Sequence, residues 1–210
     1  MQPGCHISIS KEAIAELPVV ECPVRIVTVD TVEKAELACQ ALMREKIIGF
    51  DTETRPSFHK GRTNKVALMQ LSTDEVCYLF RLNKIGLTSA LCRVLESPDL
   101  LKIGLSIHDD FNVMHRSSNV QPAGFIDLQN YVGQFHITDI SLQRVYAIIF
   151  SRKISKRQRL TNWEAAALTL RQKQYASIDA WACLHIYKYL KSGQFDPETS
   201  PYIVQECAKT

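Results

Sequence analysis

The stretch Ile47-Ile48-Gly49-Phe50-Asp51-Thr52-Glu53 is an apolar run that ends in two carboxylates. Its β-branched and aromatic residues predict a strand, on which alternate side chains share a face. Asp51 and Glu53 are therefore expected on one face. Two like charges about 4 Å apart repel by roughly 4 kcal/mol at an effective dielectric near 20, and a divalent cation relieves that repulsion because it prefers oxygen ligands. The stretch is compatible with a metal site, but the D-x-E pattern is common and by itself favours a solvated strand end with two unrelated acids.

The segments on either side of this strand predict an α/β domain with a mixed sheet. The sequence Asp30-x-x-Glu33 is a helix-capping signal, and Gly193 follows the last expected helix as a stop signal. Further strands are expected at residues 24–29, 66–72, 76–80 and 100–107. Those at residues 66–72 and 76–80 are expected to form a meander with the acidic strand. Helices are expected at residues 11–17, 30–46, 87–96, 109–116, 128–135, 142–150 and 170–191.

Composition excludes several classes of protein. The 210 residues are 46% hydrophobic and 22% charged with a net charge of +3, which is typical of one globular domain. The longest apolar runs fall short of the roughly 20 residues that a membrane span needs, and residues 1–10 lack the apolar core of a secretory signal. Seven cysteines occur without a CxxC or zinc-ligand spacing. We therefore expect reduced thiols in a cytoplasmic protein without zinc.

Two more elements carry acids in similar settings. Asp109 and Asp110 follow an apolar strand; we expect Asp109 to cap the next helix, and Asp110 to belong to the site. On the last helix, Tyr175 and Asp179 are four residues apart and therefore share a face, so a phenol and a carboxylate can address one water molecule together. Taken alone, this pair favours the simpler interpretation, a tyrosine at the core edge and a surface acid.

The three elements in this order resemble the exo I, exo II and exo III motifs of the DEDD 3′–5′ exonucleases. The resemblance covers roughly residues 24–192 and is closest to the RNase D and Werner-type group of the DnaQ-like superfamily, through Thr161-Asn162-Trp163-Glu164 and the stretch from Gln172 to Ala182. Gln174 stands where the histidine branch has its histidine, so the tyrosine (DEDDy) branch is indicated. Ser177 and Ile178 depart from the Ala or Thr usual in exo III. Neither a helicase domain nor an RNase D-type helical C-terminal domain is present in the sequence.

The resemblance implies an RNase H-like mixed sheet flanked by helices over residues 24–192, with an N-terminal arm (1–23) and a C-terminal tail (193–210). It further implies that Asp51, Glu53, Asp110 and Asp179 hold two divalent ions, Mg²⁺ or Mn²⁺. Tyr175 would orient or deprotonate the attacking water, and the products would be nucleoside 5′-monophosphates. The expected substrates are single-stranded or recessed 3′ ends of DNA or RNA.

Basic residues cluster around these acids in the sequence. The segment from Arg152 to Lys173 holds seven basic residues and one acid, a net charge of +6, which suits a polyanion, although a solvated face is the alternative. We expect Trp163 and Trp181 to be packing residues. The expected substrate-binding residues come from this segment and from the loop after Glu53, where Phe58 could stack on a terminal base: Arg55, Phe58, Lys60, Arg62, Lys156, Arg157 and Arg159.

Two functions of different class remain open at this point. One is a metal-dependent 3′–5′ exonuclease, and the other is a non-catalytic nucleic-acid or protein-binding module on the same scaffold. A binding module has no need of four converging acids and a tyrosine, whose repulsion is costly without metal. The acids therefore favour catalysis, whereas nothing in the sequence separates a DNA substrate from an RNA substrate.

Overall fold

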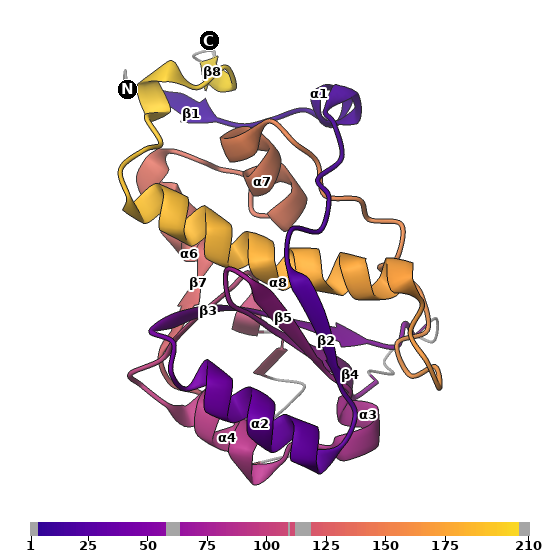
Figure 1. Ribbon diagram of the computed structural model, residues 1–210. Helices are drawn as coiled ribbons and strands as arrows, with labels where there is room; N and C mark the ends of the chain where they lie inside the picture. The colour runs from indigo at the N-terminus through magenta and orange to yellow at the C-terminus, as the bar shows by residue number, and fades with distance from the viewer. Residues whose placement is uncertain (1–3, 58–63, 109, 112–118, 206–210) are drawn as a thin grey trace.

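In the computed structural model (Figure 1), the chain forms an α/β domain around a six-stranded mixed sheet. The structure describes residues 4–57, 64–108, 110–111 and 119–205. The order of strands across the sheet is β2-β5-β4-β3-β6-β7. Their bounds are β2 Arg25–Val29, β3 Ile47–Thr54, β4 Val66–Ser72, β5 Val76–Phe80, β6 Leu101–Gly104 and β7 Phe125–Asp127.

The sheet combines a meander with parallel edges, as the sequence predicts. Strands β3, β4 and β5 pair in antiparallel fashion. Strand β2 pairs in parallel with β5 at one edge, and β6 and β7 continue in parallel from β3 at the other. Strand β4 is buried along its whole length. Because β4 and β3 are the two central strands in this order, the acidic strand β3 lies at the centre of the sheet.

Helices cover both faces of the sheet. Figure 1 shows α2 (Val32–Leu42) and α4 (Ser89–Glu96) on one face and the long α8 (Leu170–Lys191) across the other. Helix α7 (Leu142–Phe150) and the short α1 (Lys11–Glu16) lie beyond α8. Helix α8 therefore lies between the sheet and this outer layer. The remaining helical segments are α3 Leu82–Ile85, α6 Leu128–Tyr131, η1 Val132–Phe135 and η2 Pro197–Thr199.

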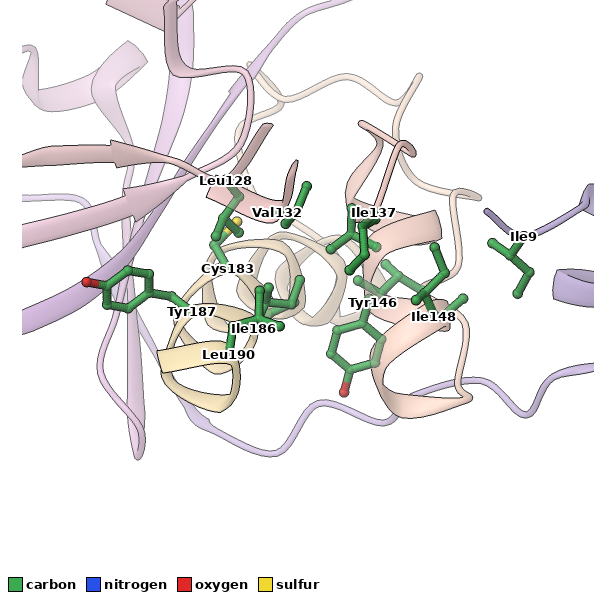
Figure 2. Close-up of a cluster of buried hydrophobic side chains, with 14 of the residues drawn as sticks. Ile9, Leu128, Val132, Ile137, Tyr146, Ile148, Cys183, Ile186, Tyr187 and Leu190 are labelled. Carbon is green, nitrogen blue, oxygen red and sulfur yellow. The ribbon is translucent and has the colours of Figure 1, made fainter. Parts of the chain in front are cut away.

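The two ends of the chain pair with each other. Strand β1 (Cys5–Ile7) is antiparallel to β8 (Ile203–Gln205) in a separate two-stranded sheet. The arm also enters the core, because Ile9 belongs to the same buried cluster as Tyr146 and Ile148 of α7 (Figure 2). The boundaries of the domain at residues 24 and 192 remain a prediction.

Most of the expected elements are present, and the differences lie at short segments. The strand expected to continue to residue 107 ends at Gly104, where a Cβ atom would lie 2.4 Å from the Ile107 side chain. The chain turns there, and Ile107, His108, Asp110 and Phe111 are already helical; the rest of the helix expected at residues 109–116 lies outside the described residues. Strands β1, β7 and β8, each of three residues, were not expected. No helix in the described part of the chain is long and apolar enough to span a membrane.

Candidate active site

Three of the four expected acids converge at one end of the sheet. Asp51 and Glu53 come from one face of β3, and Asp179 comes from α8, which crosses that face. One carboxylate oxygen from each lies within 4.8 Å of the others. Glu53 is 9% and Asp179 is 6% exposed. An all-oxygen donor set at this spacing suits a hard divalent cation such as Mg²⁺ or Mn²⁺.

Gly49 brings the two elements close enough for this convergence. Gly49 shares the face of β3 that carries Asp51, and a Cβ atom there would lie 1.9 Å from the backbone carbonyl oxygen of Ala180. Helix α8 therefore rests directly on the strand at the residue after Asp179. A glycine at this position is required by the close approach of two backbones.

The start of α8 is fixed by a capping box. Thr169 Oγ1 accepts from the Gln172 amide at 3.2 Å, and the Thr169 amide donates to Gln172 Oε1 at 3.0 Å. Gln172 Nε2 also donates to Thr161 Oγ1 at 3.0 Å. The helix therefore begins at a defined residue against the preceding loop, which sets the rotation that points Asp179 at the sheet.

Asp110 lies beside this trio rather than within it. The three-acid group is Asp51, Glu53 and Asp179, whereas Asp110 accepts a hydrogen bond from the Thr52 hydroxyl. Its charge nevertheless raises the pKa of both Asp51 and Glu53. Asp110 is thus near enough to act on the site electrostatically. Asp109, which the sequence assigned to helix capping, lies outside the described residues.

The pKa values of the acids are raised because they are desolvated next to one another. Burial raises the pKa of Glu53 to about 9, with the charges of Asp179 and Asp110 adding to the effect. Burial raises the pKa of Asp179 to about 7, although the Tyr175 hydrogen bond and Lys156 act in the opposite direction. The pKa of Asp51 is raised by the same causes, burial first. A bound dication would replace the protons that these groups hold at neutral pH.

Tyr175 lies one turn before Asp179 and hydrogen-bonds to its carboxylate. The ring of Tyr175 stacks on Trp163, with centroids 6.0 Å apart and an interplanar angle of 30°. Trp163 is fully buried, as expected for a packing residue. Burial and the neighbouring carboxylates raise the pKa of Tyr175 well above its usual range, so without metal its hydroxyl is a hydrogen-bonding group and not a base.

Asp51, Glu53, Asp179 and Tyr175 line a cavity of about 480 Å³. Basic and apolar groups complete its lining, including Lys156, Arg159 and Leu105. The site therefore joins an acidic centre to cationic and apolar surfaces within one pocket. This combination suits a phosphodiester with its attached sugar and base.

A family model described as 3′–5′ exonuclease matches residues 26–193. The chain belongs to this family. The match contains all three acidic motifs of the DEDDy pattern, and thus confirms the resemblance seen in the sequence.

Known relatives agree with the family assignment. The chain is 33% identical over 150 residues to a 3′-5′ exonuclease of Arabidopsis thaliana, a match that covers 69% of the chain and 52% of the relative. It is 30% identical over 150 residues to the mouse bifunctional 3′-5′ exonuclease/ATP-dependent helicase WRN, covering 69% of the chain and 11% of that protein. The chain thus spans about half the length of the plant relative and about a tenth of the mouse one.

Solved structures confirm the RNase H-like fold. The Nibbler exonuclease domain of Aedes aegypti superposes with a TM-score of 0.69 at 26% identity, covering 87% of this chain and 95% of that chain. Escherichia coli RNase D superposes with a TM-score of 0.73 at 23% identity, covering 80% of this chain and 45% of that chain. The second match is informative about the fold alone.

The structure places only some of the expected basic residues at the pocket. Lys156 and Arg159 line the pocket, whereas Arg157 is exposed and does not line it. Arg55 forms an ion pair with Glu164 at 3.3 Å, so the acid of the basic segment is engaged by the loop after β3. Phe58, Lys60 and Arg62 lie outside the described residues.

Part of the pocket lining was not anticipated from the sequence. Besides Thr52, which lies between the two acids of β3, it consists of Leu105, Gln129, Ile140, Ser141, Leu142, Gln143, Ile154 and Cys183. Most of these residues are apolar or uncharged and occur in segments read only as helix starts or loops. A sequence signal was available for Cys183 alone, which is four residues after Asp179 and therefore on the same face of α8.

Proposed function

We propose that this domain is a metal-dependent 3′–5′ exonuclease that hydrolyses the terminal phosphodiester of DNA or RNA and releases nucleoside 5′-monophosphates. The single observation that carries the proposal is the convergence of Asp51, Glu53 and Asp179 within 4.8 Å at the pocket. Three desolvated carboxylates repel one another unless a cation lies between them. The family match supports the reaction type.

Each residue of the site has a proposed role in this reaction. Asp51, Glu53 and Asp179, with Asp110 beside them, would hold the ions. Two divalent ions, Mg²⁺ or Mn²⁺, would supply Lewis acidity for the attacking water and for the leaving 3′ oxygen. Tyr175, held by Asp179 and Trp163, would orient the attacking water through its hydroxyl. Lys156 and Arg159 would bind phosphate oxygens at the rim of the pocket.

The substrate class is proposed as a nucleic acid 3′ end, single-stranded or recessed. Structural neighbours include E. coli RNase D, described as an exoribonuclease involved in structured RNA processing, and Trypanosoma brucei RNase D in complex with the RNA U12. The mouse relative is a bifunctional exonuclease and helicase. Both DNA and RNA are therefore proposed as substrates.

The proposed location is the cytoplasm. The free thiols of the six described cysteines agree with this location.

The test compares matched DNA and RNA oligonucleotides labelled at the 5′ end. With Mg²⁺ or Mn²⁺, wild-type protein should shorten them one nucleotide at a time, and EDTA or Asp51→Asn should abolish the reaction. Oligonucleotides labelled at the 3′ end should release labelled mononucleotide at once. Binding without shortening, under the same conditions, would instead support the non-catalytic module.

A further inference from the structure

The pocket has a wall that comes from neither β3 nor α8. It consists of Ile140–Gln143 at the start of α7, together with Ile154 and Lys156 just beyond that helix. We call these residues the α7 wall. Gln143 Nε2 donates to the Ile154 carbonyl at 2.7 Å and so joins its two halves. Ser141 Oγ is buried without a hydrogen-bond partner in the described part of the chain.

One end of the α7 wall is tied to the N-terminal arm through Asp139. This residue is 8% exposed and immediately precedes the wall. Its Oδ2 accepts from Ser8 Oγ at 3.0 Å and from the Ile9 amide at 2.9 Å. Its Oδ1 accepts from Arg144 of α7 at 2.6 Å. Asp139 therefore joins the arm and α7 through both of its oxygens.

The other end of the wall is tied to the same arm. The Val20 amide donates to the Lys153 carbonyl at 3.0 Å, and the Lys153 amide donates to the Pro18 carbonyl at 2.9 Å. The Lys153 ammonium group also donates to the Ala15 carbonyl. Lys153 immediately precedes Ile154 of the wall. Lys153 therefore contacts the arm, although its charge was included in that of the basic segment from Arg152 to Lys173.

Hydrophobic packing reinforces both ties. Ile7, Ile9, Ile14 and Val20 of the arm are buried in one cluster with residues of α7 and α8. Figure 2 shows Ile9 with Ile137, Tyr146 and Ile148 in this cluster. The family match begins at residue 26, so these arm residues lie outside the region shared with the family model.

We propose that the arm, residues 5–20, positions the α7 wall for nucleic-acid binding and that Asp139 is its positioning residue. The proposal rests on the proposed function. The carboxylates on β3 and α8 are held by the sheet and by the Gly49 contact, and Asp139 takes part in neither. Loosening Asp139 should therefore weaken the binding of an oligonucleotide and leave the chemistry at the carboxylates intact.

The test uses Asp139→Asn in the full chain with two substrates. One is a single-stranded oligonucleotide, and the other is the p-nitrophenyl ester of thymidine 5′-monophosphate, which is too small to extend along the wall. The variant removes the charge that holds Arg144, so KM for the oligonucleotide should rise roughly tenfold, the effect of one charged hydrogen bond. The kcat for the oligonucleotide and the hydrolysis of the small ester should stay within about twofold of wild type, as for an unperturbed chemical step.

Two further variants keep the experiment decisive. Ser8→Ala changes the arm alone and should raise KM for the oligonucleotide by a smaller factor. This variant tests the proposal if Asp139→Asn does not fold. Asp74→Asn is the matched control, because it removes a carboxylate from an exposed ion pair with Lys188, and neither residue lines the pocket. It should leave both substrates unaffected.

Parallel loss of turnover on both substrates would overturn the proposal, because it would mean that Asp139 serves only the stability of the whole domain. An unchanged KM in both Asp139→Asn and Ser8→Ala would overturn it as well. Failure of the proposed function is distinguishable, since it would abolish turnover in the wild type. In that case, the Kd of wild type and variants for a phosphorothioate oligonucleotide still decides whether the arm positions the wall.

Discussion

Replacing Asp179 by Asn should make the metal-free protein more stable. Burial raises the pKa of Asp179 from 3.8 to about 7. The folded state therefore keeps a proton between these two pH values that the unfolded state has released. Stability is lost as the pH rises from about 4 to about 7, and the loss is then constant, because the unfolded state binds fewer protons throughout that range. The neutral amide avoids this cost and can still accept a hydrogen bond from Tyr175.

The size of the effect follows from the shift in pKa. Three pKa units at about 1.4 kcal/mol each correspond to an upper limit of about 4 kcal/mol at pH 8. For a chain of this length, 1 kcal/mol moves Tm by roughly 2–4 °C, so Asp179→Asn should raise Tm in EDTA by several degrees. The difference should shrink towards zero as the pH is lowered to 4. Mg²⁺ at 100 times its Kd should remove most of the difference, since it adds about 2.7 kcal/mol to the wild type.

Thermal unfolding by circular dichroism, at pH 4, 6 and 8 in EDTA and in Mg²⁺, measures all of these differences. Asp30→Asn is the control, because it removes the same charge from an exposed pair with Lys34 on α2. An exposed pair of this kind contributes only about 0.3–0.5 kcal/mol. If Asp179→Asn lowers Tm in EDTA equally at every pH, Asp179 does not bear a desolvation cost, and the electrostatic reasoning about the site is refuted.

Three other predictions concern the same site. Gly49→Ala should destabilise the fold by about 1–3 kcal/mol and lower kcat, because the Cβ would lie 1.9 Å from the Ala180 carbonyl; Gly133→Ala, with no atom within 4 Å of its Cβ, should do neither in the same unfolding and turnover assays. Tyr175→Phe should lower kcat by about 10²–10⁴ with little change in KM, and near-normal turnover would reduce Tyr175 to a packing residue. Mn²⁺ affinity, measured by calorimetry, should rise steeply from pH 6 to 8, because protons on Asp179 and Glu53, with pKa values of about 7 and about 9, compete with the metal; a flat profile would contradict this.

The elements that carry the chemistry could be predicted from the sequence. Residues 47–53 read as a strand ending in acids, and the structure has β3 over Ile47–Thr54. Residues 142–150 and 170–191 read as helices, and α7 and α8 have these bounds. Periodicity and capping are local properties, so they are readable from neighbouring residues. Short strands such as β7 escaped this reading because their three residues carry too little pattern.

The way in which these elements meet could not be predicted, because it depends on tertiary packing. The contact of Gly49 with Ala180, the pairing of Arg55 with Glu164 and the bonds from Asp139 to Ser8 and Ile9 join residues 109 or more positions apart. No local pattern encodes such contacts, because they depend on how the helices and the arm pack over the sheet. The position of Asp110 also depends on packing. The sequence predicted Asp110 among the site acids, and in the structure it lies beside them and accepts a hydrogen bond from the Thr52 hydroxyl.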